Sequence, residues 1–119
     1  MPKKMMFILR TPPYGTKKAE AHYDMLLAAI AFGHIATIVF CDDGVFQLLK
    51  GQGTRDIAMK NLAKQWQVLE LLPINAIYVA EDALTTRHLQ VHDLCLTVTP
   101  ISSTQLSLLM QQQDFIISI

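Results

Sequence analysis

The sequence lacks the charge excess and the cysteine clusters that mark several common classes of protein. Its 119 residues include ten basic and ten acidic side chains, without the positive excess typical of proteins that bind phosphate backbones. The two cysteines, Cys41 and Cys95, have no partner at CxxC spacing, which argues against a thiol-based zinc site and a disulfide framework. We therefore expect no direct nucleic-acid binding and no metal site.

Long apolar runs are also absent. The run at residues 5–9 ends at Arg10 and is too short for a signal-peptide core or a membrane span. We therefore expect a cytoplasmic protein that does not contact membranes. A chain of this length is typical of one domain, here residues 1–119, which buries roughly two thirds of the surface that its unfolded form exposes.

Charge is scarce as well, and it is unevenly distributed. Charged residues make up 17% of the chain, below the roughly 25% of typical soluble domains, and no Lys or Arg follows Arg87. The helix predicted near residues 105–112 has no charged residue and has Leu108 on the flank opposite Leu106. This composition predicts a surface that packs against another subunit, in the C-terminal third of the chain.

Short apolar runs rich in Ile, Val and Phe alternate with helical patterns. The predicted strands are residues 5–9, 36–41, 76–80, 94–99 and 115–119. The predicted helices are residues 19–31, 45–50, 54–73 and 83–88 and a last one beginning at Ser102 or Ser103, with Thr16 and Thr54 as N-caps and Gly33 as a C-cap. The alternation predicts an α/β fold: a three-layer α/β/α sandwich with a five-stranded, mainly parallel, flavodoxin-like sheet.

Ligands of such sheets bind at the carboxyl ends of the strands, so the loops there are the first candidates for a site. The loop after the first strand stands where flavodoxin-like proteins hold a phosphate with backbone N–H groups. Pro12 and Pro13 have no N–H to donate and favour an extended loop. This loop suits the presentation of Arg10 and Tyr14 to a partner, and we expect no flavin, nucleotide or other cofactor.

The loop after the second strand contains Cys41, Asp42, Asp43 and Gly44. The two acids are more simply read as a helix N-cap than as a magnesium site, which would need further acids. Cys41 precedes a helix start, which favours a reactive thiolate, but the neighbouring carboxylates oppose ionisation. We favour a small buried residue and keep a sulfur-carrying Cys41 as the alternative.

With these loops in view, the chain resembles the DsrF/TusC branch of the DsrE-like sulfur-relay family along its whole length. The most specific motif is Asp43-Gly44-Val45-Phe46-Gln47-Leu48-Leu49, followed by Gly51-Gln52. Pro13-Tyr14-Gly15 after the first predicted strand supports it. No general rule for α/β proteins requires these residues in this order.

The resemblance implies a DsrE-like sandwich that forms a hexamer with DsrE/TusD-like and DsrH/TusB-like paralogues. Such complexes pass persulfide sulfur toward thiolation of the tRNA wobble uridine or serve intracellular sulfur oxidation. The main sulfur-carrying cysteine follows the third strand of the DsrE/TusD-like subunit, and the matching residues 78–82 contain no cysteine. We therefore expect a non-catalytic subunit whose partner contacts include Arg10, Tyr14, Asp43, Phe46, Gln47 and Leu108. Without partners, the same surface is available for homo-oligomers.

Overall fold

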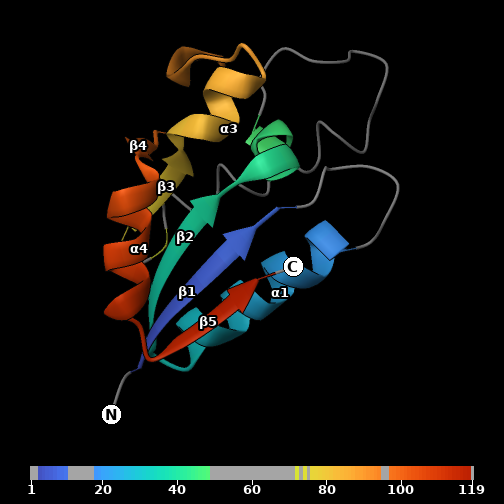
Figure 1. Cartoon of the computed structure of the whole chain (residues 1–119). Coiled ribbons are helices and arrows are strands. Elements are labelled where there is room, and N and C mark those ends of the chain that lie inside the picture. Colours follow the sequence, from blue (N-terminus) through green and yellow to red (C-terminus); the bar gives the residue numbers. More distant parts are fainter. Residues whose placement is uncertain are drawn as a thin grey trace.

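The computed structural model describes residues 3–10, 18–48, 72, 74, 76–94 and 97–118 (Figure 1). The strands are β1 (Lys4–Leu9), β2 (Ile35–Phe40), β3 (Ala76–Ala80), β4 (Thr99–Ile101) and β5 (Phe115–Ser118). The α-helices are α1 (Lys18–Ala31), α3 (Glu81–Thr86) and α4 (Ser103–Gln111), and the 3₁₀ helices are η1 (Asp42–Leu48) and η3 (Val91–Asp93). Strands and helices alternate along the chain as the sequence pattern predicts.

The five strands form one sheet in the order β4-β3-β2-β1-β5, and every neighbouring pair is parallel. Phe7 of β1 is in register with Ile38 of β2 and with Ile117 of β5. Because neighbouring strands run in parallel, the carboxyl ends of β1, β2, β3 and β4 meet at one edge of the sheet. The predicted five-stranded parallel sheet is confirmed.

Helices cover both faces of this sheet (Figure 1). On one face, Leu26 of α1, Val45 of η1 and Leu84 of α3 belong to one buried cluster with strand residues such as Phe7. On the other face, α4 packs Leu106, Leu109 and Met110 against a second cluster that includes Met6, Val39 and Cys41. The predicted three-layer α/β/α sandwich is therefore confirmed.

Helix ends are fixed by the residues that the sequence singles out. Gly33 adopts φ 82°, its N–H donates to Ile30 O at 3.0 Å, and the next N–H, of His34, donates to Ala29 O at 3.1 Å. These two bonds form a Schellman cap, which confirms the end of α1 at Gly33. Ser102 and Gln105 form a capping box at the start of α4, so Ser102 is the N-cap.

The predicted strand at residues 94–99 is wrong in its bounds, because β4 starts only at Thr99 and continues to Ile101. Leu94 and Val98 are buried in the core on the α1 side instead. The observed strand includes Pro100, which cannot donate to a ladder. An edge strand accepts proline, and β4 is an edge strand of this sheet.

Two helices begin earlier than their apolar pattern indicates. The predicted helix at residues 45–50 is a 3₁₀ helix that begins at Asp42, and the one at residues 83–88 begins at Glu81. Both helices start within two residues of the end of the preceding strand, and both start with acidic residues, which favour a helix N-terminus. The predicted helix at residues 54–73 and the predicted N-cap Thr16 lie outside the described residues.

Candidate functional site

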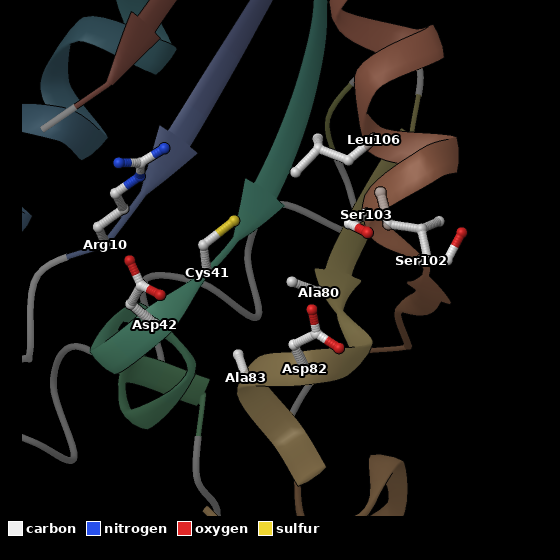
Figure 2. A pocket seen from close by; sticks show the side chains of 10 residues that line it. Arg10, Cys41, Asp42, Ala80, Asp82, Ala83, Ser102, Ser103 and Leu106 are labelled. Carbon is white, nitrogen blue, oxygen red and sulfur yellow. The ribbon is translucent and has the colours of Figure 1, made fainter. Parts of the chain in front are cut away.

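A pocket of about 240 Å³ lies at the edge of the sheet where β1, β2, β3 and β4 end (Figure 2). Its polar lining residues are Arg10, Cys41, Asp42, Asp82, Ser102 and Ser103. Its apolar lining residues are Ala80, Ala83, Ile101 and Leu106. This is the edge at which the sequence pattern places a ligand site.

Cys41 is the deepest polar residue of this pocket. It is 7% exposed, and Figure 2 shows its sulfur pointing from the end of β2 toward α4. Burial raises the pKa of this thiol from 9.0 to about 11, the Arg10 charge lowers it by less, and Asp42 raises it further. Cys41 is therefore a neutral thiol at physiological pH, in agreement with the interpretation as a small buried residue.

Gly44 lets the chain fold back directly after β2. The N–H of Cys41 donates to Leu9 O at 2.9 Å, and the N–H of Gly44 donates to Cys41 O at 2.8 Å. A Cβ atom at position 44 would overlap the carbonyl oxygen of Leu9, which is backbone and cannot move aside. Asp42, which lies between Cys41 and Gly44 in the chain, adopts a left-handed φ of 48°. The glycine of the family motif thus fixes the turn that supports Cys41.

Asp43 holds η1 against α3 through Arg87. The Nε and Nη2 atoms of Arg87 donate to Asp43 Oδ1 at 3.2 and 2.9 Å, and Nη1 donates to Ala83 O at 3.3 Å. The guanidinium also lies 5.8 Å from the ring centroid of Phe46. Sequence reasoning gave Arg87 no role, since no local pattern connects two residues 44 positions apart.

The predicted partner-binding residues that the structure describes lie in three separate places. Arg10 lies on the pocket rim, whereas Asp43 and Phe46 meet around Arg87. Leu108 is 55% exposed and lines a separate groove of about 310 Å³.

That groove runs between α4 and the β3–β4 edge, with Tyr78 and Thr99 on its other side. The remaining two predicted contacts, Tyr14 and the Gln47 side chain, lie outside the described residues. The arrangement accordingly joins Arg10 and Cys41 in one site and brings Asp43 and Phe46 together around Arg87.

Two further properties concern the described part of the chain only. None of its helices combines the length and the apolar character needed to cross a bilayer. It also contains no group of three or more His, Cys, Asp or Glu side chains arranged to hold a metal ion.

A model of the DsrE/DsrF-like family matches residues 3–119. The chain belongs to the DsrE/DsrF-like family. It is 39% identical over 92 residues to the intracellular sulfur oxidation protein DsrF of Allochromatium vinosum, covering 77% of this chain and 68% of that protein. It is 34% identical over 103 residues to a TusC homologue of Vibrio vulnificus, covering 87% of each chain. These relatives confirm the resemblance to the DsrF/TusC branch.

Two more comparisons extend this family assignment along the chain. A TusC homologue of Pseudomonas aeruginosa is 30% identical over 119 residues, which is the whole of both chains. The crystal structure of the ychN protein from E. coli superposes with a TM-score of 0.79 at 16% identity, covering 98% of this chain and 99% of that one. The structural match shows the shared fold, and the DsrE/DsrF-like fold predicted from the sequence is confirmed.

Proposed function

We propose that this chain is a subunit of a cytoplasmic sulfur-relay complex and carries no persulfide itself. The observation that supports this most directly is Ala80, which lines the pocket at the end of β3. In DsrE/TusD-like subunits, the resemblance puts the sulfur-carrying cysteine just after this strand. Here a methyl group takes that place, and Cys41 on the neighbouring strand is a protonated thiol with a pKa of about 11.

The partners of this subunit are DsrE/TusD-like and DsrH/TusB-like paralogues, two copies of each chain forming a hexamer. The surface of α4 supports this proposal, because all of its exposed residues are uncharged: Ser103, Thr104, Gln105, Ser107, Leu108 and Gln111. An uncharged surface can enter an interface without the cost of burying unpaired charge. Leu108, at the centre of this surface, is the residue we expect to be most deeply covered.

The sulfur that passes through the complex goes either to thiolation of the tRNA wobble uridine or to intracellular sulfur oxidation. Relatives named DsrF and TusC lie at similar identities to this chain, so both routes stay open. The residues that distinguish the routes lie largely in the partners, and the identity of the neighbouring genes separates them.

Coexpression tests the proposed function. The chain is produced with and without the two paralogues from its own genome, and the products are analysed by native mass spectrometry. We expect a hexamer with two copies of each chain when all three are present, and a smaller or self-associated species from the isolated chain. A stable monomer that binds neither paralogue would contradict the proposal.

The second candidate function is direct sulfur transfer through Cys41, because its sulfur faces the pocket (Figure 2). In that reaction the Cys41 thiolate attacks the outer sulfur of a donor persulfide. A new S–S bond forms at Cys41, the S–S bond of the donor breaks, and the donor thiolate leaves. The raised pKa of Cys41 opposes this step, since only the thiolate attacks.

Mass spectrometry distinguishes the two candidate functions. The assembled complex is incubated with a persulfide donor, the remaining thiols are blocked, and the modified cysteine is located in the peptide map. The first proposal expects sulfur on a partner cysteine and an unmodified Cys41. A persulfide on Cys41 that then moves to the partner would favour the second candidate.

A further inference from the structure

The rim of the pocket described above bears three charges that have no ion-pair partner among the described residues. Asp42 of η1 and Asp82 of α3 contribute two carboxylates, and Arg10 after β1 contributes one guanidinium (Figure 2). By contrast Asp43, next to Asp42, is neutralised by Arg87 at 2.9 Å. The rim thus has a net negative charge and open hydrogen-bonding capacity.

The floor of the pocket is mainly apolar, in contrast to the charged rim. It is formed by Ala83, Ile101 and Leu106 together with the Cys41 thiol. This thiol is nine-tenths buried and points into the space, and no described residue forms a hydrogen bond with its sulfur. An apolar floor with one neutral, unpartnered thiol favours a small apolar or sulfur-containing group over an ion.

The size of the pocket limits what can fill it. Its volume of about 240 Å³ is below the roughly 300 to 1,000 Å³ of pockets that enclose whole cofactors or drug-sized ligands. One or two side chains fit a space of this size better than a flavin or a nucleotide. Side chains of a larger molecule would therefore fill this space.

We infer that this pocket is a docking site for a short segment of a partner subunit. A small apolar or sulfur-containing side chain of that segment enters between Cys41 and Leu106, and a Lys or Arg beside it pairs with Asp42 and Asp82. Opposite charges across an interface favour this partner over an acidic one. The inference rests on the proposed function, since it names the surface through which the subunit binds within the relay complex.

Matched substitutions test the docking site. Ser103→Phe places a ring at the pocket wall, and Thr86→Phe places the same ring on an exposed position of α3, outside both the pocket and the α4 surface. Asp82→Lys reverses a rim charge, and Glu81→Lys makes the same change of charge in the same first turn of α3, outside the pocket lining. Affinity for the two paralogues is measured by calorimetry, and the melting temperature of each variant confirms that it is folded.

We expect Ser103→Phe and Asp82→Lys to weaken binding by about tenfold or more, and both controls by no more than about twofold. If the wild-type chain binds the paralogues and each pocket variant has the same affinity as its control, the inferred docking site is wrong while the proposed function stands. If wild-type chain binds neither paralogue, the proposed function itself fails. Loss of binding in both members of a pair would also contradict the docking site, because the effect would not depend on the pocket.

Discussion

Arg87 connects η1 with the C-terminal end of α3, so its replacement tests how the family motif is held in place. The perturbation is Arg87→Met, which keeps most of the apolar stem and removes the guanidinium. The substitution deletes both hydrogen bonds to Asp43 Oδ1, the bond to Ala83 O at 3.3 Å and the contact with Phe46. The bonds to Asp43 and the contact with Phe46 join η1 to the end of α3, and the bond to Ala83 O lies within that end of α3, so we expect loss of stability together with loosening of η1.

The expected magnitude follows from the exposure of the groups. The Asp43 side chain is 53% exposed and that of Arg87 21%, so solvent screening limits the ion pair to about 0.5 kcal/mol. The contact with Phe46 contributes a similar amount, about 0.5 kcal/mol, and the charged hydrogen bond to Ala83 O about 1 kcal/mol. Together we expect a loss of about 2 kcal/mol, which lowers the melting temperature by about 8 °C for a domain of this size.

Thermal and urea unfolding of four proteins measures the effect: wild type, Arg87→Met, Asp43→Asn and the double variant. Lys3→Met is the control, because it also replaces a cationic side chain by Met, at an exposed residue whose side chain has no described contact. The double-mutant cycle isolates the Asp43–Arg87 pair, for which we expect about 0.5 kcal/mol of coupling. The reasoning is refuted if Arg87→Met melts within about 2 °C of Lys3→Met.

Four further predictions concern the pocket and the turn beside it. With a pKa of about 11, Cys41 should react with iodoacetamide at a rate that rises about tenfold per pH unit from pH 8 to 10. Peptide mapping measures this rate, and a plateau below pH 9 would contradict the conclusion that burial raises the pKa. The same raised pKa means that the contribution of the protonated Cys41 thiol to native stability is lost as pH rises from about 9 to about 11, because the unfolded chain releases this proton first. Gly44→Ala should lower the free energy of unfolding in urea by about 3 kcal/mol or more, because the new Cβ overlaps Leu9 O. Gly33→Ala should lower it by only about 1 kcal/mol, because of the left-handed φ of that residue. Equal losses would disprove the steric explanation. Ala80→Cys in a Cys41→Ser background should acquire a persulfide from a donor, detectable as a mass increase of one sulfur, and its absence would show that the pocket wall is closed to donors.

Much of the fold is readable from the sequence because buried parallel strands leave a simple signal. β1 and β2 are nearly continuous in Ile, Val, Phe and Met, since both of their faces are covered by helices. The caps at Gly33 and Ser102 are equally local, since each depends on residues within a few positions. Signals of this kind do not depend on the rest of the fold.

The features that the sequence does not predict depend on contacts between residues that are far apart in the chain. The bounds of β4 depend on its place at the edge of the sheet, where Pro100 is tolerated. The partner of Asp43 is Arg87, which is distant in the chain and comes close only when α3 packs beside η1. The sequence therefore does not predict that Asp43 and Phe46 meet around Arg87, and their contacts with a partner subunit stay a prediction. The position of the pocket itself was predicted, because it follows from parallel topology alone.

The central claim is that this chain serves a sulfur relay without carrying sulfur, and one rate measurement tests it most directly. Sulfur transfer from a persulfide donor to the downstream acceptor is followed through the assembled complex, with wild-type chain and with the Cys41→Ser variant. Because Cys41 is a buried, protonated thiol, the two rates should agree within about twofold. A complex that assembles normally with Cys41→Ser but transfers sulfur about a hundredfold more slowly would contradict the claim.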